Sequence, residues 1–492
     1  MSTTAEVDVL IVGAGISGIG AAHHLSTKRP GTSFAILDGR QEIGGTWSLF
    51  KYPGIRSDSD MPTFGYDFKP WTHEKSIAEA QYIVEYLQDT VDSAGIGPHI
   101  RFGHQVRRAE YATDTGTWTV TAERPDGETV EVTSRFLFLG TGYYDYEAGY
   151  TPEFAGLEDF EGRLVHPQHW PEDLDYTGKR VVVIGSGATA VTLIPSMARE
   201  TAHITMLQRS PSYVLSIPSV DPVAQLLKRF VGQERAHQST RRKNIRIQRG
   251  LYKLAQRYPK AVRKVIMADA RRRLPKGYDV DTHFNPSYDP WDQRLCMVPD
   301  GDFFRSIRRG DASVVTDTID RFVPEGIRLS SGRVLEADIV VTATGLNMLA
   351  FGRIELAVDG EDVSIPDCVV YKSMMLSNVP NFAFAFGYTN ASWTLKVDLV
   401  CEHFCRLLDH MDAHGKTTFT PRLDREIRRA PLMDLSSGYV QRGIDRFPQA
   451  GAEGAWTVEM AYEADVARLR EGPIEDADLV FGTASPREPA TA

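Results

Sequence analysis

Cysteine is scarce in this sequence, and no two cysteines have redox spacing. The 492 residues contain four, and none forms a Cys-x-x-Cys pair. That absence excludes the disulfide-dependent pyridine nucleotide oxidoreductases, which need such a pair. Cys401 and Cys405 lie one helical turn apart in VCEHFCRLL, where a buried apolar helix face explains them better than a zinc site does. We therefore expect reduced thiols, no metal site and a cytoplasmic location.

Long apolar runs and a surplus of positive charge are also missing. No run approaches the roughly 20 apolar residues that cross a bilayer, and the N-terminus lacks the pattern of a secretory signal. The formal charge of -10 argues against nucleic acid as a partner. The exception is the basic region 228–276, which predicts a solvated helical lobe or a subunit contact. Peripheral contact with anionic lipid and a homo-oligomer stay open.

A dinucleotide-binding pattern begins near the N-terminus. VDVLIV predicts a buried parallel strand, GIGAAHHLSTK a helix, and FAILD a second strand that ends on Asp38. In the loop between them, Gly13, Gly15 and Gly18 allow a tight turn, close approach of a pyrophosphate and close helix packing, with Ser17 beside them. Asp38 has the spacing of a carboxylate that binds a ribose hydroxyl. Such an N-terminal unit is typical of FAD enzymes, although these residues alone do not choose FAD over NAD.

A second unit of the same kind starts at residue 180. VVVI precedes Gly185-Ser186-Gly187-Ala188-Thr189-Ala190, in which alanine replaces the third glycine. The next strand ends in Gln208-Arg209-Ser210 instead of an acid. A carboxylate there would repel a 2′-phosphate, whereas a guanidinium and a hydroxyl would bind it. We predict NADPH as the second cofactor; the alternative is that Arg209 is a solvated strand end.

These patterns predict an α/β fold with two Rossmann-like dinucleotide-binding domains, one for FAD and one for NADP, and a helical insertion. TGTWTVTAERPDGETVEVTSRFLFLGTG adds antiparallel strands with a turn at Asp126-Gly127. The predicted boundaries are 1–142 and 346–482 for the FAD domain, 143–217 and 292–345 for the NADP domain, 218–291 for the insertion and 483–492 for a disordered tail.

Two further motifs occur between the glycine loops. GGTWSLFKYPGIRSD covers residues 44–58, and FEGRLVHPQHWP covers 160–171 with Phe160, Gly162, His166, Trp170 and Pro171 at fixed spacing. Such a match at five positions over twelve residues is rare by chance. In this order with the loops, the motifs resemble the signatures of the type I Baeyer–Villiger monooxygenases, and in particular their ethionamide-activating branch in mycobacteria.

The resemblance implies an enzyme that uses FAD, NADPH and O2 to convert ketones to esters or lactones through a C4a-peroxyflavin. It also implies oxidation of sulfides or thioamides. The expected substrates are small and apolar, and several aromatic residues would suit a pocket for them: Tyr143, Tyr144, Trp291, Phe386 and Trp393. The alternatives are a flavin N- or S-hydroxylating monooxygenase and a non-enzymatic flavin-binding protein.

The resemblance further implies roles for individual residues. Arg294, in WDQRLCMVPDGDFF, would be the catalytic arginine, because a guanidinium stabilises an anionic oxygen without protonating it. Asp58 is its expected counter-ion, with a helix or turn cap as the alternative. Gln293 stands where a lysine often helps to hold the 2′-phosphate, which leaves more of the NADPH selectivity to Arg209. The remaining expected contacts are Gly45, Thr46 and Trp47 with the flavin, Val106 with adenine, and Arg56 and Ser57 with the nicotinamide side of NADPH.

The segment between the two glycine loops has a less direct role. A histidine in a linker is more often a hydrogen-bonded structural element than a proton carrier. We therefore predict that His166 and Trp170, together with Phe160 and Gly162, couple motion of the NADP domain to the flavin site.

Overall fold

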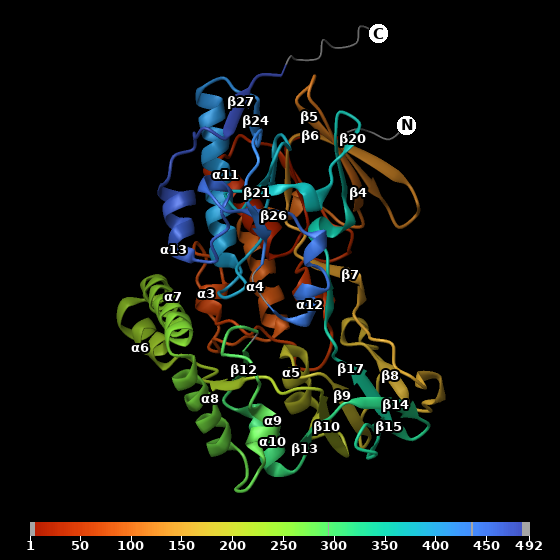
Figure 1. Cartoon of the computed structure of the whole chain (residues 1–492). Helices are drawn as coiled ribbons and strands as arrows, with labels where there is room; N and C mark the ends of the chain where they lie inside the picture. Colours follow the sequence, from red (N-terminus) through yellow and green to blue (C-terminus); the bar gives the residue numbers. More distant parts are fainter. Residues whose placement is uncertain (1–4, 294, 434–435, 485–492) are drawn as a thin grey trace.

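Two separate sheets organise the chain. The computed structural model describes residues 5–293, 295–433 and 436–484 (Figure 1). A nine-stranded sheet occupies the upper half of Figure 1 and a five-stranded parallel sheet the lower half. Each contains a strand, a glycine loop and a helix in succession, so the predicted α/β class with two dinucleotide-binding units is confirmed.

The first sheet joins a parallel half to an antiparallel half. Strand β1 (Ala5–Val12) pairs in parallel with β2 (Phe34–Leu37) and with β6 (Thr129–Leu139). Strands β4 (Gln105–Ala112), β5 (Thr117–Glu123) and β6 are antiparallel, as expected from their alternating pattern. Side chains alternate along β1, so Val9 and Ile11 face one apolar cluster while Leu10 and Val12 face another. Helices α1 (Ile16–Lys28), α4 (Ala80–Ser93) and α11 (Thr394–Ala413) contribute to the first of these clusters.

The second sheet is entirely parallel. Its strand order is β13 (Ala312–Thr316), β10 (His203–Gln208), β9 (Arg180–Ile184), β17 (Ile339–Thr342) and β8 (Arg163–Val165). Helices α5 (Ala188–Met197) and α10 (Asp302–Arg309) pack against it. Its central strands are almost fully buried, which explains their continuous runs of Val and Ile.

The chain crosses between the sheets along a two-stranded ribbon. Strand β7 (Tyr144–Gly149) leads from the first sheet to the second, and β18 (Leu346–Met348) leads back. The ribbon is extended by hydrogen bonds from Tyr150 N–H to Gly345 O (3.1 Å) and from Leu349 N–H to Tyr143 O (3.1 Å). A change in the angle between the two sheets would therefore bend or twist this ribbon.

A helical lobe lies beside the junction of the two halves (Figure 1). It contains α6 (Pro222–Val231), α7 (Gln233–Arg257), α8 (Pro259–Arg273) and α9 (Val280–Phe284). The buried guanidinium of Arg241 attaches α7 to the first half by donating to the carbonyls of Pro62, Thr63 and Gly65, the last at 2.7 Å.

The described residues also bear on the expected membrane spans, thiols and C-terminal tail. None of the helices in the described part is long and apolar enough to span a membrane. All four cysteines are buried and none is in a disulfide, as expected for reduced thiols. Of the predicted tail, residues 485–492 lie outside the described residues, whereas Ala484 N–H donates to Thr417 Oγ1.

The other α-helices and strands are short. They are α2 (Thr46–Leu49), α3 (Met61–Phe64), β3 (Ile100–Arg101), β11 (Val214–Ile217), β12 (Cys296–Pro299), β14 (Ile319–Val323), β15 (Gly326–Leu329), β16 (Val334–Glu336), β19 (Glu355–Val358), β20 (Glu361–Asp362), β21 (Val369–Tyr371), β22 (Met375–Leu376), β23 (Phe382–Phe384), β24 (Thr418–Pro421), β25 (Arg429–Pro431), α12 (Gly438–Gln441), β26 (Gln449–Gly451), α13 (Tyr462–Asp465) and β27 (Leu479–Gly482).

Two buried histidines should make the fold sensitive to acid. Burial lowers the pKa of His237 to about 4 and that of His403 to about 3. Both pKa values lie below the roughly 6.5 of an unfolded chain, so the unfolded state binds more protons as the pH falls. The contribution of these histidines to stability is therefore complete above about pH 6.5 and is lost as the pH falls to about 4 for His237 and to about 3 for His403. We expect each histidine to lower the free energy of unfolding by about 2 kcal/mol between pH 7 and 5.

Urea unfolding at both pH values measures this loss. The H403Q variant should lose its share of the pH dependence, while H414Q, at an exposed histidine, should keep all of it. An unchanged pH dependence in H403Q would contradict the prediction.

Candidate active site

The first glycine loop combines two packing glycines with one that faces open space. Gly13 has φ +102°, and a Cβ there would lie 2.7 Å from Gly140 O. A Cβ on Gly18 would lie 1.8 Å from Gly13 O, so neither position accepts a side chain. At Gly15 a Cβ would make only ordinary contact, 3.6 Å from Gly45 Cα. Gly15 is therefore free to meet a ligand at the N-terminus of α1.

A cavity of about 130 Å³ lies at this loop. Among the residues that line it are five of the predicted FAD contacts: Gly13, Gly15, Asp38, Gly45 and Val106. The Asp38 carboxylate accepts hydrogen bonds from Ala14 N–H (2.7 Å) and Arg40 N–H (2.8 Å). Burial raises the pKa of Asp38, against these hydrogen bonds, which lower it. The loop donors, the absent side chains and the carboxylate fit an adenosine diphosphate moiety.

Three further predicted FAD contacts lie around this cavity instead of lining it. Ser17 is buried, and its Oγ accepts from Trp393 Nε1–H at 2.9 Å. Thr46 hydrogen-bonds the Tyr146 side chain. Trp47 packs edge-on against Phe64, with 5.4 Å between ring centroids.

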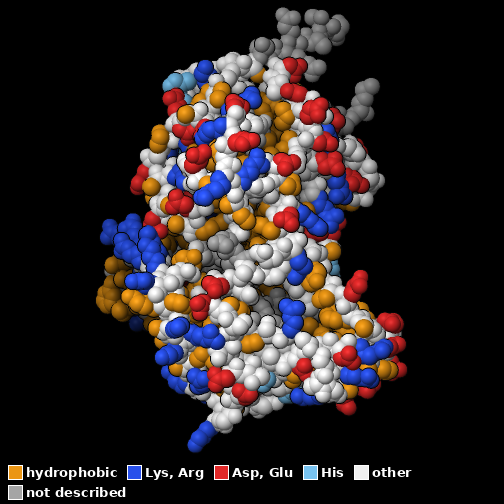
Figure 2. Space-filling model, viewed as in Figure 1, with side chains coloured by type: hydrophobic (Ala, Val, Ile, Leu, Met, Phe, Trp, Pro, Cys, Tyr) orange, Lys and Arg blue, Asp and Glu red, His pale blue; other side chains and the backbone are white. Residues whose placement is uncertain are grey.

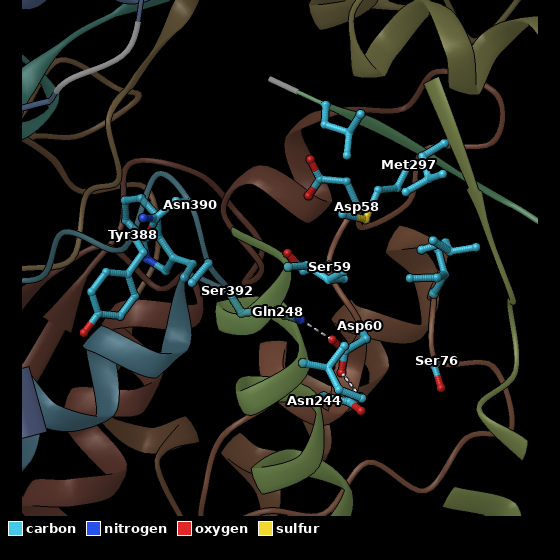
Figure 3. A pocket seen from close by; sticks show the side chains of 18 of the residues that line it. Asp58, Ser59, Asp60, Ser76, Asn244, Gln248, Met297, Tyr388, Asn390 and Ser392 are labelled. Atoms are coloured by element: carbon cyan, nitrogen blue, oxygen red, sulfur yellow. Dashed lines mark hydrogen bonds between the residues drawn. The ribbon is translucent and has the colours of Figure 1, made fainter. Parts of the chain in front are cut away.

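A larger cavity of about 440 Å³ lies between the first half, the helical lobe and the segment before β12 (Figure 3). Its lining comes from segments far apart in the sequence: 58–60, 215–222, 243–251, 291–293, 295–297 and 386–393. Tyr143, Trp291, Phe386 and Trp393 line it, whereas Tyr144 lines the smaller cavity. Tyr143 stacks on Trp393 with 5.0 Å between centroids. The neighbouring residues Tyr143 and Tyr144 thus separate the two cavities.

Asp58 lines this larger cavity in a fixed loop. The loop is held by hydrogen bonds from Ser57 N–H to Ala78 O (2.8 Å) and from Met61 N–H to Ser76 O (2.7 Å). The N-cap of α3 is Asp60, whose carboxylate accepts from Thr63 N–H, so capping of this helix does not explain Asp58. Arg294 lies outside the described residues; Gln293 and Leu295 on either side of it line the cavity.

The second glycine loop, like the first, has one glycine packed against the backbone and one that faces open space. Gly185 has φ +129°, and a Cβ there would lie 2.3 Å from Ala343 O. At Gly187 a Cβ would meet no atom within 4 Å, and Ala190 is fully buried. The loop is steadied by its neighbours: Ser186 Oγ lies 2.8 Å from Ser212 Oγ, and Thr189 hydrogen-bonds the Tyr52 side chain. Ala188 begins α5.

The predicted NADP contacts outside the loop are in different settings. Arg209 and Ser210 are exposed after β10, and Arg209 forms no ion pair with any residue that the structure describes. Arg56 instead pairs with Asp302 at the start of α10, with 2.6 Å between Nη1 and Oδ2. Ser57 is buried and donates to Ser59 O.

The linker motif touches both the second sheet and the crossing ribbon. Phe160 packs edge-on against Phe322, and a Cβ on Gly162 would lie 2.3 Å from the Phe160 ring. Trp170 packs against the core of the second sheet. A Cβ on Gly149, in β7, would lie 1.9 Å from His166 Cε1, so the imidazole packs directly on the ribbon. Burial lowers the pKa of His166, which favours a neutral structural role over proton transfer.

This contact predicts a kinetic effect. We expect H166A to lower turnover about tenfold while FAD content stays unchanged, because the ring that spaces the linker from β7 is lost. H169A is a matched control, since His169 also reaches β7 through Glu147 O (3.0 Å) but is exposed. Steady-state kinetics with NADPH measures the effect, and an unchanged kcat in H166A would contradict the coupling role.

The cavity also contains a hydrogen-bonded polar group, centred on Asp60, that no sequence motif predicted. Asp60 accepts from Asn244 Nδ2 (2.7 Å) and Gln248 Nε2, and so joins the first half to α7 (Figure 3). Asn390 and Ser392 also line the cavity. They lie in GYTNASWTLK, the stretch that leads into α11.

Two sheets with parallel strands at their glycine loops, one of them mixed and the other entirely parallel, and a mainly apolar cavity beside the first define a two-dinucleotide-domain flavoprotein oxidoreductase. The model of the family "Flavin-binding monooxygenase-like" matches residues 7–231. The FAD-containing monooxygenase EthA of Mycobacterium tuberculosis is 50% identical over 480 residues, which cover 97% of this chain and 98% of EthA. The chain therefore belongs to the FAD-containing monooxygenases and is an enzyme.

Solved structures show the same fold. Steroid monooxygenase bound to NADP matches with a TM-score of 0.76 at 20% identity, over 97% of this chain and 100% of that one. Cyclohexanone monooxygenase bound to ε-caprolactone matches with a TM-score of 0.71 at 24% identity, over 85% of this chain and 90% of that one.

Proposed function

We propose that this enzyme is an NADPH-dependent Baeyer–Villiger monooxygenase acting on small apolar ketones. One atom of O2 enters the bond between the carbonyl carbon and its neighbour, the other leaves as water, and NADPH supplies the two electrons. The observation that carries this proposal is the position of Asp58, a carboxylate in the wall of a mainly apolar cavity next to the flavin-type loop. Sulfides and thioamides are proposed as further substrates.

The chain offers a separate place for each cofactor. The loop 13–18, Asp38, Gly45 and Val106 would hold FAD, since the packing glycines leave Gly15 open toward a cavity. The loop 185–190 would hold NADPH, with Arg209 and Ser210 at its 2′-phosphate. FAD bound there supplies hydride acceptance and oxygen activation.

The cavity residues have distinct roles in the proposed reaction. Its aromatic and aliphatic wall binds the ketone and excludes water, which strengthens the electrostatic interactions inside it. Arg294, assigned by resemblance, would stabilise negative charge on the reacting oxygen atoms. Asp58 would hold that guanidinium in place and offset the cost of desolvating it.

Product analysis tests the proposal. The FAD-loaded enzyme, supplied with NADPH and air, should convert a panel of cyclic and aryl ketones to lactones and esters. A thioether in a parallel reaction reports sulfoxidation. Sulfoxide without any ester would favour the N- or S-hydroxylating alternative, and hydrogen peroxide without any oxygenated product would overturn both.

A further inference from the structure

The helical lobe exposes an apolar surface that nothing in the described chain covers. Of the eleven exposed large apolar side chains that the structure describes, nine lie within residues 223–265. On α6 they are Val223, Leu226 and Phe230, spaced to share one face, and Phe230 is 78% exposed. Single exposed apolar residues are common, but a cluster marks an interaction site.

Helix α7 has a polar contact face and an exposed apolar stripe. Arg241, Asn244 and Gln248 join α7 to the first half through buried or half-buried hydrogen bonds. Beside them run Ile247, Leu251, Leu254 and Tyr258 at i, i+4, i+7 and i+11, and all four are exposed. A helix that only covered the core would place these side chains inward.

The charges around this surface are mainly positive. Residues 222–273 contain sixteen Lys and Arg but only two Asp and Glu, in a chain whose formal charge is -10. Several of the cations are exposed and form no ion pair with described residues, among them Arg229, Arg246, Lys253 and Arg257. Figure 2 shows apolar side chains directly beside Lys and Arg at the protruding lobe. An apolar face with cations around it is the pattern of helices that lie in the interface of an anionic bilayer.

The same surface borders the large cavity. Pro222 of α6 and Ile247 and Leu251 of α7 line it, and the latter two are also exposed at the surface. We propose that α6 and α7 form a membrane-docking surface that rests on anionic phospholipid and opens the cavity toward the bilayer. The occupant follows from the charges: a bilayer offers both hydrocarbon and anionic headgroups. This surface is independent of the proposed reaction, and its test needs no turnover.

Co-sedimentation of the full FAD-loaded chain with vesicles tests the surface. Binding to phosphatidylglycerol vesicles should exceed binding to phosphatidylcholine vesicles at least tenfold and should weaken at high salt. L226S/F230S and R246Q/K253Q should each reduce binding at least tenfold. The matched controls are V480S, at an exposed valine of β27, and R328Q/R333Q, at exposed arginines of the second half. Both controls should bind like the unchanged chain.

Three outcomes would overturn the proposal. Equal sedimentation of all variants with the vesicles would show that the lobe is not the contact. A chain that ignores vesicles but is a dimer in sedimentation velocity, and becomes a monomer in L226S/F230S, would assign the face to a second copy. Binding to a DNA duplex without binding to vesicles would assign it to nucleic acid. Thermal melts of each variant confirm that lost binding is not lost folding.

Discussion

The Gly15→Ala variant should fold normally and fail to retain FAD. Its methyl group would make only ordinary contact with the protein, 3.6 Å from Gly45 Cα, yet it would enter the cavity that Gly13 and Asp38 also line. A ligand whose pyrophosphate must approach this backbone would clash with it. We expect the affinity for FAD to fall about 100-fold, which corresponds to about 3 kcal/mol. Flavin absorbance per protein after gel filtration measures the retention of FAD, and the melting temperature of the flavin-free chain measures whether the variant folds normally.

Two other glycines separate the ligand effect from a packing effect. Gly18→Ala would place Cβ 1.8 Å from Gly13 O, so the backbone must move, and the flavin-free fold should lose about 3 kcal/mol of stability. Gly31→Ala, at an exposed position with no atom within 4 Å of the added Cβ, should change neither property. Full flavin content in Gly15→Ala would show that this loop does not meet the cofactor.

The glycine pattern could be read from the sequence because its cause is local. The turn needs a positive φ at Gly13, and the helix after it brings Gly18 against Gly13 O, so both requirements for glycine arise within the loop itself. The same holds for Gly185, and for the alternation that predicted the β5–β6 hairpin. Short-range steric rules therefore gave the fold class correctly.

The cavity could not be read in this way. Its wall brings Asp58, the β11–α6 segment, the middle of α7 and residues 386–393 together across more than half of the chain. Sequence spacing does not encode such distances. Asp58 was expected only as the partner of an arginine that the resemblance implied, and the aromatic residues only because such side chains suit an apolar pocket. Nothing local indicated that Asp60 would join Asn244 and Gln248.

The basic lobe shows a third limit. Its charged composition predicted solvated helices or a subunit contact. Periodicity can identify an apolar stripe on such a helix, but it does not show what covers the stripe. On α7 the contact with the first half uses Arg241 and its polar neighbours, and the apolar stripe is left outside. Tertiary contacts cover the polar face of α7 and leave its apolar stripe exposed. The exposed stripe is the reason that we propose α7 as a docking element.

The Asp58→Asn variant should lose most of its oxygenation activity without losing its cofactors. Asparagine keeps the size of the side chain in its fixed loop but removes the negative charge that, in the proposed mechanism, pairs with Arg294. Removing one such electrostatic contribution from a water-excluding site lowers turnover by about 100-fold or more. Ester formed per NADPH consumed measures the loss, and hydrogen peroxide should replace the missing product.

The control for this variant is the same chemical change elsewhere in the same cavity. Asp221 also lines it, but there the carboxylate caps α6 by accepting from Val223 N–H (2.9 Å) and Ala224 N–H (3.0 Å). Its other oxygen accepts from Lys243 Nζ (2.5 Å), a bond that an amide oxygen can also accept. Asparagine caps helices about as well as aspartate does, so Asp221→Asn should leave turnover within about twofold. If Asp58→Asn matched Asp221→Asn in ester yield and rate, the charge at Asp58 would have no part in the chemistry. The carboxylate would then serve only the shape of the loop that carries it.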